Sequence, residues 1–284
     1  MLYNAVIEAT NMLRARTTLR PRVALILGSG LGDLANEIEQ PVTVPYEDIP
    51  HFARSTVVGH VGQLLFGMLE RVPVVAMQGR FHFYEGHTMQ TLAFPVRVMH
   101  ELGAEILVVS NAAGGVNPAY RPGDFMLLRD HIFMPGLAGA NPLIGPNDER
   151  FGERFPPLAG AYDVTLRASA RAIASTQNIS LYEGVYTMVA GPSFETQAEL
   201  RFLRTIGTDA VGMSTVPEVI AARHMKMRVL GISLITNAAT GEEGEAAEEL
   251  SHIDVLAVGN AARPRFTQLV RGILQDVNSL NPPA

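Results

Sequence analysis

The spacing of apolar and polar positions predicts a chain in which strands and helices alternate from end to end. Apolar runs typical of strands occupy residues 22–28, 63–69, 72–78, 105–115, 124–132, 183–190, 209–213 and 228–236. Helical spacing of apolar residues occupies 2–15, 88–103, 162–177, 195–206, 216–226 and a last segment from about 252. This alternation predicts an α/β fold, a single domain over 1–284 whose central mixed β-sheet is flanked by helices on both faces.

Two interruptions in this pattern carry expectations of their own. Pro95 lies inside the predicted 88–103 helix, so we expect that helix to bend there. The connection at 135–160 is rich in proline, glycine and asparagine and is too long for a simple turn. We therefore expect it to form a lid or part of a subunit interface.

Composition and charge narrow the class of protein. Apolar residues make up 47% of the chain, which favours a large core and a partly apolar subunit interface. The net charge of −6, without a basic run, argues against nucleic-acid or anionic-membrane partners. The chain has no cysteine and no apolar run long enough to cross a membrane, so disulfides, zinc–thiolate sites and spanning helices are excluded. Because residues 1–19 lack the pattern of a signal peptide, we expect a cytoplasmic protein.

The segment 189–218 holds the most informative polar residues. Each of its two polar clusters, Pro192–Glu195 and Ser214–Pro217, follows a β-like segment and precedes a helical one. Strand ends that lead into helix N-termini favour anions, because free N–H groups and the helix dipole point there. The first cluster offers a carboxylate beside an aromatic ring, and the second offers a hydroxyl with free amides. This pairing suits a ligand with a flat hydrogen-bonding part and an anionic part.

The glycine-rich sequence GSGLG, residues 28–32, directly follows the first predicted buried strand. Its glycines let the backbone approach a phosphate, and Ser29 adds a hydroxyl. A dinucleotide-binding fingerprint needs a small residue at the next position, where Asp33 stands, so that interpretation is disfavoured. A plain tight turn is the structural alternative.

The segment 80–87 places a cation, imidazoles and a phenol after a predicted strand. On an extended chain Arg80, His82 and Tyr84 point to one face, while two phenylalanines point to the other. Arginine and histidine together form an anion clamp, which explains the segment better than a half-exposed strand edge. His60 stands between apolar residues, a context more typical of a hydrogen-bonded core histidine.

Two further strands end in residues suited to a ligand. One reaches Asn111 and then four small residues, which clear space and offer the Ala112 N–H; close helix–sheet packing explains them equally well. The other reaches Asn237, whose amide can both donate to and accept from the edge of a heterocycle. The acidic segment 242–249 is more typical of a solvated loop than of a metal site.

Other chemistries lack the motifs that they need. The nucleophile elbow G-x-S-x-G is absent, because the segments around Ser193 and Ser214 lack the second glycine. The sequence has no H-E-x-x-H, no phosphate loop with lysine and no aspartate cluster suited to calcium or magnesium. We therefore expect neither a metal nor a cofactor.

Seven segments taken together resemble the trimeric class of purine nucleoside phosphorylases. In order between Gly28 and His252 they are GSGLG, GRFHFYEG, SNAAGGVN, NPLIGPNDERFGERF, VAGPSFET, GMSTVPE and SLITN. The resemblance implies reversible phosphorolysis of 6-oxopurine (deoxy)ribonucleosides such as inosine and guanosine, within purine salvage. Orthophosphate would be the co-substrate, the products would be the purine and (deoxy)ribose 1-phosphate, and the enzyme would be a homotrimer.

The resemblance also implies a role for individual residues. Phosphate would be held by Ser29, His60, Arg80, His82, the Ala112 N–H and Ser214. The purine would be bound by Glu195 and Asn237, with Phe194 stacked on it and Ala113 and Gly115 lining the strand ends. The ribose would contact Tyr84, Met213 and His252, and Phe155 would reach it from a neighbouring subunit. Catalysis would depend on Asn237, Glu195 and His82. The sequence departs from many family members at Ala238, where they carry lysine, and in its glutamate-rich segment 241–249.

Three other functions stay open on the sequence. A methylthioadenosine phosphorylase shares the fold and the phosphate chemistry, but typically has threonine and aspartate where Ser29 and Asn237 stand. A dinucleotide-binding oxidoreductase would use GSGLG and leave GRFHFYEG and GPSFET unexplained. A non-catalytic nucleoside-binding protein would need Glu195 and Asn237 but neither Arg80 nor His82.

Overall fold

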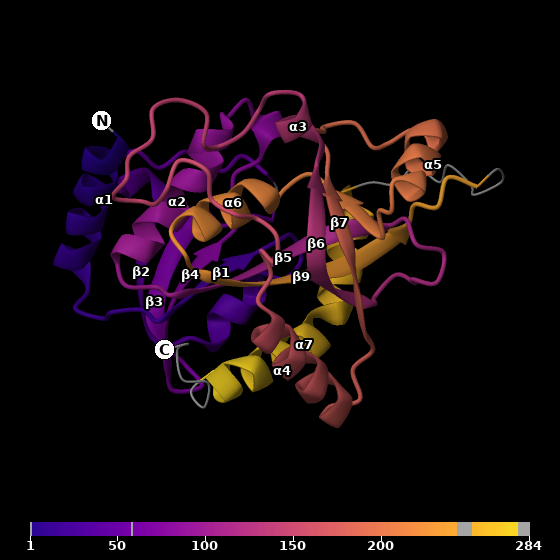
Figure 1. Ribbon diagram of the computed structural model, residues 1–284. Helices are drawn as coiled ribbons and strands as arrows, with labels where there is room; N and C mark the ends of the chain where they lie inside the picture. The colour runs from indigo at the N-terminus through magenta and orange to yellow at the C-terminus, as the bar shows by residue number, and fades with distance from the viewer. Residues whose placement is uncertain (1, 58, 243–251, 278–284) are drawn as a thin grey trace.

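The computed structural model describes residues 2–57, 59–242 and 252–277, which form a mixed nine-stranded sheet between two layers of helices (Figure 1). The strands are β1 (Val23–Leu27), β2 (Glu39–Pro45), β3 (Gln63–Leu69), β4 (Val72–Gln78), β5 (Ile106–Gly115), β6 (Phe125–Phe133), β7 (Leu181–Met188), β8 (Ala210–Gly212) and β9 (Arg228–Ala238). The α-helices are α1 (Leu2–Arg16), α2 (Met89–Glu101), α3 (Met134–Leu137), α4 (Val164–Thr176), α5 (Gln197–Thr205), α6 (Val216–His224) and α7 (His252–Val277). Short 3-10 turns are η1 (Gly32–Glu37), η2 (Tyr46–Asp48) and η3 (Phe83–Glu85).

The strand order combines an open sheet with a closed ring. The order is β2-β3-β4-β1-β5-β8-β7-β6-β9, and β9 also pairs with β5. The last five strands therefore close on themselves, which leaves no unpaired edge among them. Strands β4, β1, β5 and β9 run parallel to their neighbours in this series, so their carboxyl ends meet at one edge of the sheet.

Two hydrophobic cores lie on the two faces of the sheet. Helices α1, α2 and α6 cover one face, and α4 and α7 cover the other (Figure 1). Strand β1 shows the division: Ala24 and Ile26 belong to the first core, whereas Val23, Leu25 and Leu27 belong to the second. Because successive side chains of a strand point to opposite faces, a strand covered on both faces needs an uninterrupted apolar run.

The structure confirms the predicted fold class and the predicted elements, with most boundaries shifted by one or two residues. Strand β2 was not predicted, since six of its seven side chains are exposed and it lacks the apolar pattern of a buried strand. Helix α2 continues through Pro95 as a single element. Within the described residues, no helix is both long and apolar enough to cross a membrane.

Asp163 joins helix α4 to strand β9. Its carboxylate caps α4 by accepting a hydrogen bond from the Leu166 N–H at 2.9 Å. Arg228 donates to both carboxylate oxygens, from Nε at 2.7 Å and from Nη2 at 2.9 Å. Burial raises the pKa of Asp163, but the hydrogen bonds from Arg228 and Leu166 outweigh burial and leave the pKa below its usual range. The ionised carboxylate therefore stabilises the folded state.

We predict that Asp163→Ala lowers the free energy of unfolding by about 2–3 kcal/mol, because it removes a helix cap and a charge-assisted hydrogen-bonded pair. The lowered pKa means that this contribution is present above the unfolded pKa of about 3.9 and is lost as pH falls through the folded pKa. Urea unfolding should therefore show the difference from wild type shrinking below about pH 4. The exposed Asp48 gives a matched control, whose replacement by alanine should change stability by less than about 0.5 kcal/mol. Equal losses in both variants would contradict the assignment.

Candidate active site

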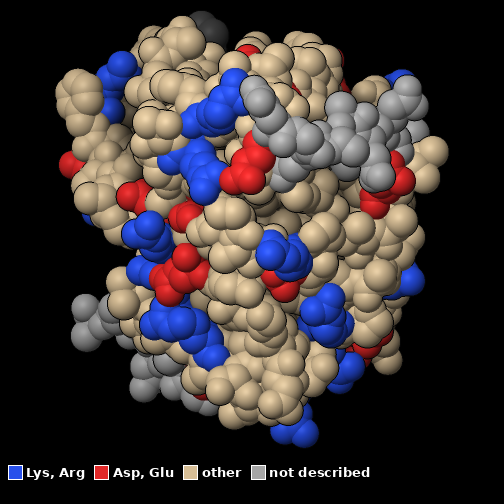
Figure 2. All heavy atoms as spheres, turned by 90° about the vertical axis from the view of Figure 1, so that its right-hand side faces the viewer, with Lys and Arg blue, Asp and Glu red and all other residues tan. Residues whose placement is uncertain are grey.

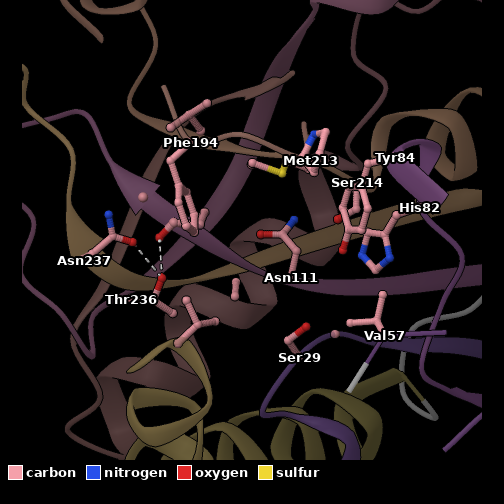
Figure 3. Close-up of a pocket in the computed structure, with 18 of the residues that line it drawn as sticks. Ser29, Val57, His82, Tyr84, Asn111, Phe194, Met213, Ser214, Thr236 and Asn237 are labelled. Carbon is pink, nitrogen blue, oxygen red and sulfur yellow. Dashed lines mark hydrogen bonds between the residues drawn. The ribbon is translucent and has the colours of Figure 1, made fainter. Parts of the chain in front are cut away.

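The carboxyl ends of β1, β4, β5, β8 and β9 surround a cavity of about 360 Å³ (Figure 3). Its lining includes most of the residues singled out from the sequence: Ser29, Arg80, His82, Tyr84, Ala112, Ala113, Phe194, Glu195, Met213, Ser214 and Asn237. Segments that are far apart in the sequence thus meet around this cavity. The carboxyl edge of the strands is where open α/β sheets bind their ligands.

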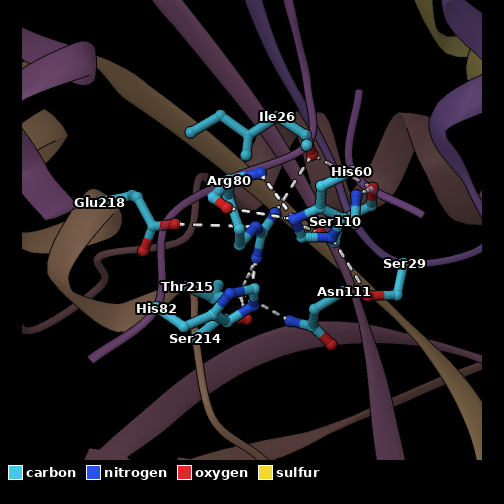
Figure 4. Close-up of polar contacts among 12 residues, drawn as sticks. Ile26, Ser29, His60, Arg80, His82, Ser110, Asn111, Ser214, Thr215 and Glu218 are labelled. Carbon is cyan, nitrogen blue, oxygen red and sulfur yellow. Dashed lines mark hydrogen bonds and ion pairs between the residues drawn. The ribbon is translucent and has the colours of Figure 1, made fainter. Parts of the chain in front are cut away.

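Arg80 is the centre of a polar network at one end of the cavity (Figure 4). Its Nη1 donates to the hydroxyls of Ser214 and Thr215, each at 2.8 Å, and its Nη2 donates to two backbone carbonyls of β1 and β5. The carboxylate of Glu218 lies 3.8 Å from Nε. The Arg80 residue is only 2% exposed, and a cation so deeply buried is tolerated because these groups compensate for lost water.

The turn between β8 and α6 supplies the partners of Arg80. Thr215 has a φ of +79°, a conformation that β-branched residues rarely adopt. Hydrogen bonds to its hydroxyl from Arg80 and from Asn111 Nδ2, at 2.9 Å, hold it there. Burial raises the pKa of Glu218, and the nearby cation opposes that rise.

Three stacked rings form a second part of the same end. His60 stacks on His82 with ring centroids 5.3 Å apart, and His82 stacks on Tyr84 with centroids 4.7 Å apart. The hydroxyl of Ser29 lies 3.2 Å from Nε2 of His60. Burial and the neighbouring His82 lower the pKa of His60 to about 4, so its ring is neutral at pH 7.

Glu85 holds His82 in place. Its carboxylate accepts from the backbone N–H of His82 at 2.7 Å and lies 3.1 Å from Nδ1 of the ring. Thr56 donates to the same carboxylate from its N–H and its hydroxyl. Burial raises the pKa of Glu85, but these hydrogen bonds outweigh burial and lower it to about 2. Because an ionised carboxylate only accepts, Nδ1 of His82 is the donor.

The other end of the cavity is formed by Phe194, Glu195 and Asn237, as Figure 3 shows for the first and last of them. The side-chain oxygen of Asn237 accepts from the Thr236 hydroxyl at 3.0 Å, which orients the amide. Its Nδ2 lies 3.2 Å from the backbone oxygen of Ala238. Burial raises the pKa of Glu195.

Among the residues that the structure describes, the lining of the cavity does not include four of the predicted site residues. His60 reaches the cavity through Ser29, and Gly115 faces a β9 side chain instead. Phe155 is 84% exposed, on the long connection before α4. His252 is the first residue of α7, and its side chain lies outside the part of the chain that the structure describes.

The structure also adds residues to which the sequence analysis had assigned no individual binding role, although Asn111, Pro192 and Thr215 stand in segments that it had singled out. They are Val57, Asn111, Pro192, Val211, Gly212, Thr236 and Val255 in the cavity wall, with Thr215, Glu218 and Glu85 behind it. Thr215 and Glu218 belong to the motif GMSTVPE, and Glu85 belongs to GRFHFYEG. These two motifs could therefore have pointed to the supporting residues. Val57 and Val255 come from segments without a polar pattern and could be found only from the fold.

A second cavity of about 450 Å³ adjoins the first and shares Phe194 and Glu195 with it. Its other walls come from α3, the end of β7 and α5, and they are mostly apolar. Exposed aromatic and aliphatic side chains lie in the same region, including Phe202 and Leu137. Among the described residues, no group of three or more histidine, aspartate or glutamate side chains could hold a metal ion.

Comparison with known proteins gives consistent matches over nearly the whole chain. Residues 22–275 match the model of the Phosphorylase superfamily. Purine nucleoside phosphorylase 1 of Bacillus subtilis (strain 168) is 58% identical over 254 residues, which cover 89% of this chain and 92% of that protein. The purine nucleoside phosphorylase of Rattus norvegicus is 51% identical over 267 residues, which cover 93% and 92%.

A solved structure extends the match to three dimensions. The crystal structure of Schistosoma mansoni purine nucleoside phosphorylase in complex with inosine aligns with a TM-score of 0.92 at 41% identity, and covers 99% of this chain and 98% of that one. The α/β fold with a mixed central sheet is therefore shared with these proteins. On family model, sequence identity and fold together, this chain belongs to the purine nucleoside phosphorylases of the phosphorylase superfamily.

Proposed function

We propose that this protein, as a single domain over 1–284, catalyses the reversible phosphorolysis of 6-oxopurine (deoxy)ribonucleosides in purine salvage. Inosine or guanosine and orthophosphate would give the free purine and (deoxy)ribose 1-phosphate. The observation that supports this most is one cavity with a buried cation and hydroxyls at one end and a carboxylate, an amide and an aromatic ring at the other. The relatives named above, one of them described in complex with inosine, support the same activity.

Orthophosphate binds, in this proposal, at the Arg80 end. Arg80 supplies the positive charge, and Ser214, which accepts from Arg80, can donate its own hydroxyl proton to a phosphate oxygen. Ser29, His82 and the Ala112 N–H supply further contacts, and His60 orients Ser29. A clamp of this kind positions the phosphate for attack and needs no metal or cofactor.

The purine binds at the other end, with the ribose between Tyr84 and Met213. Cleavage of the N-glycosidic bond builds positive charge on the ribose ring and negative charge on the departing base. The phosphate stabilises the ribose cation and then forms the new bond to its anomeric carbon. Asn237 donates to N7 of the leaving purine, which stabilises the growing negative charge. Glu195 accepts from N1–H, which fixes the 6-oxo tautomer of the base.

The decisive assay measures phosphate-dependent release of hypoxanthine from inosine, with adenosine and methylthioadenosine beside it. Preference for methylthioadenosine would indicate the related phosphorylase instead. Release that does not need phosphate would indicate a hydrolase, and binding without turnover would indicate a nucleoside-binding protein.

We further propose a cytoplasmic homotrimer in which Phe155 of one subunit covers the ribose site of the next. Support comes from the exposure of Phe155 and from the apolar second cavity beside Phe194. A closed ring of head-to-tail contacts also suits the high apolar content of the chain. Acidic and basic side chains are interspersed on the face that carries α5 (Figure 2), which agrees with small-molecule rather than nucleic-acid partners.

We predict that inosine and guanosine are cleaved with a kcat/KM up to about 10⁴-fold above that of adenosine, because adenine reverses the hydrogen-bond pattern at N1 and O6. Asn237→Asp should narrow this gap, since a carboxylate can accept from an exocyclic amine. Asn4→Asp on the exposed surface of α1 is the control and should leave the ratio unchanged. Equal kcat/KM values for adenosine and inosine in the wild type would contradict the proposed specificity for 6-oxopurines.

We predict that Ser214→Ala raises the phosphate KM by about 10-fold or more, the effect of one lost hydrogen bond to a charged group. Arg80→Ala should raise it further and also lower stability, because Glu218 then lies buried without its cation. Sulfate should compete with phosphate in initial-rate measurements. The exposed Ser175 on α4 supplies the control substitution to alanine. An unchanged phosphate KM in both site variants would refute the clamp.

We predict that light scattering finds a particle of three times 30.7 kDa and that Phe155→Ala keeps this mass while raising the nucleoside KM. The reason is that Phe155 is 84% exposed and contributes to a neighbouring site rather than to its own core. Val164→Ala, an exposed apolar residue on α4, is the control and should alter neither quantity. A fully active monomer would refute the shared site.

A further inference from the structure

Helix α7 touches the glycine-rich loop after β1 backbone to backbone. A Cβ at Gly30 would lie 2.7 Å from the Cα of Gly259, and a Cβ at Gly259 would lie 2.6 Å from the Cα of Gly30. Side-chain atoms do not approach backbone so closely, so the contact requires glycine on both sides. Gly30 also has a φ of +75°, which favours glycine by itself.

Glycine in the interior of a helix lowers helix stability by about 1 kcal/mol relative to alanine. The packing of α7 against the loop, which only glycine permits, offsets this loss. The contact is also buried on the helix side, since Gly259, two turns into α7, is buried. Gly272 of the same helix differs, because its Cβ would meet side chains rather than backbone: Cγ2 of Ile173 on α4 and the amide of Gln177, the residue that follows α4. Side chains can shift or change rotamer at a local cost, whereas the backbone at Gly30 can give way only if the whole loop moves.

Two neighbouring residues of α7 extend the contact. Leu256 packs against the segment before His60, where a Cβ at Gly59 would lie 3.2 Å from its Cδ2. Arg263 forms an ion pair with Asp33 at the far end of the glycine-rich loop. Positions 256, 259 and 263 lie on one face of a helix. That face therefore contacts both the loop after β1 and the segment before β3.

These two segments carry Ser29 and His60. Ser29 directly precedes Gly30, His60 directly follows Gly59, and their side chains lie 3.2 Å apart. The helix thus contacts the residue next to each member of the pair, Gly30 beside Ser29 and Gly59 beside His60. Val255 of the same helix lines the cavity itself, so α7 also reaches the site where the nucleoside is proposed to bind.

We propose that α7 positions the Ser29–His60 pair for phosphate, and that the Gly30–Gly259 contact sets the distance of the helix from the loop. Gly259 is then a positioning residue that touches no substrate. This inference rests on the proposed function, because it takes Ser29 as a phosphate contact. If the helix only filled the core, alanine at Gly259 and at Gly272 would act alike.

The test compares Gly259→Ala with Gly272→Ala, the same substitution in the same helix. For each protein the phosphate KM, the inosine KM at saturating phosphate, and the melting temperature with and without inorganic phosphate are measured. We expect Gly259→Ala to raise the phosphate KM by about 10-fold, as for one lost hydrogen bond, while the inosine KM changes less than about 2-fold. Phosphate should also raise its melting temperature less than that of wild type. Gly272→Ala should lose some thermal stability but keep the wild-type phosphate KM.

Equal phosphate KM values in the two variants, or a parallel rise in both, would overturn the inference. If Gly259→Ala does not fold, Leu256→Ala takes its place, because it removes a contact without creating a clash. Its phosphate KM should rise several-fold, whereas the control Ile253→Ala, exposed on the same helix, should match wild type. A Leu256→Ala variant with an unchanged phosphate KM would equally overturn it. A wild type that cleaves inosine without phosphate would refute the proposed function instead, so the two failures are distinguishable.

Discussion

The buried guanidinium of Arg80 is the interaction on which the rest of the site depends. It connects β1 and β5, through backbone carbonyls of both strands, to the β8–α6 turn, through Ser214 and Thr215. A cation with so little access to water is costly unless hydrogen bonds and a counter-charge replace hydration. Glu218 supplies that charge from α6. The cation can therefore keep its position in the cavity only if α6 keeps its position over the sheet.

The neighbouring His60 adds no second positive charge beside that cation. His60 is neutral at pH 7 because burial and His82 lower its pKa to about 4. Glu85 is ionised and orients His82 through Nδ1. An anion that enters the cavity therefore meets one fixed guanidinium and several oriented hydrogen-bonding groups, an arrangement that favours binding with little reorganisation.

Closure of the five-stranded ring connects the two ends of the cavity. Pairing of β5 with β9 places Asn237 opposite Gly114, beside the small residues that follow Asn111. Pairing of β5 with β8 brings Val211 to the same Gly114 and so delivers the Ser214 turn to the other end. The distance between the anion end and the amide end is thus determined by strand register rather than by flexible loops, which suits a reaction between two bound partners.

The sequence by itself determined the elements and most of the residues around the cavity. Apolar runs and helical spacing are local signals, and cavity residues such as Ser29, Arg80 and Asn237 lie at or just after strand ends, which the same signals locate. Only the tertiary structure decided the closure of β9 on β5, the exposed strand β2 and the approach of α7 to Gly30. Each of these depends on pairing or packing between segments far apart in the chain. Such contacts are selected by the shape of the whole core, and no local pattern of side chains records them.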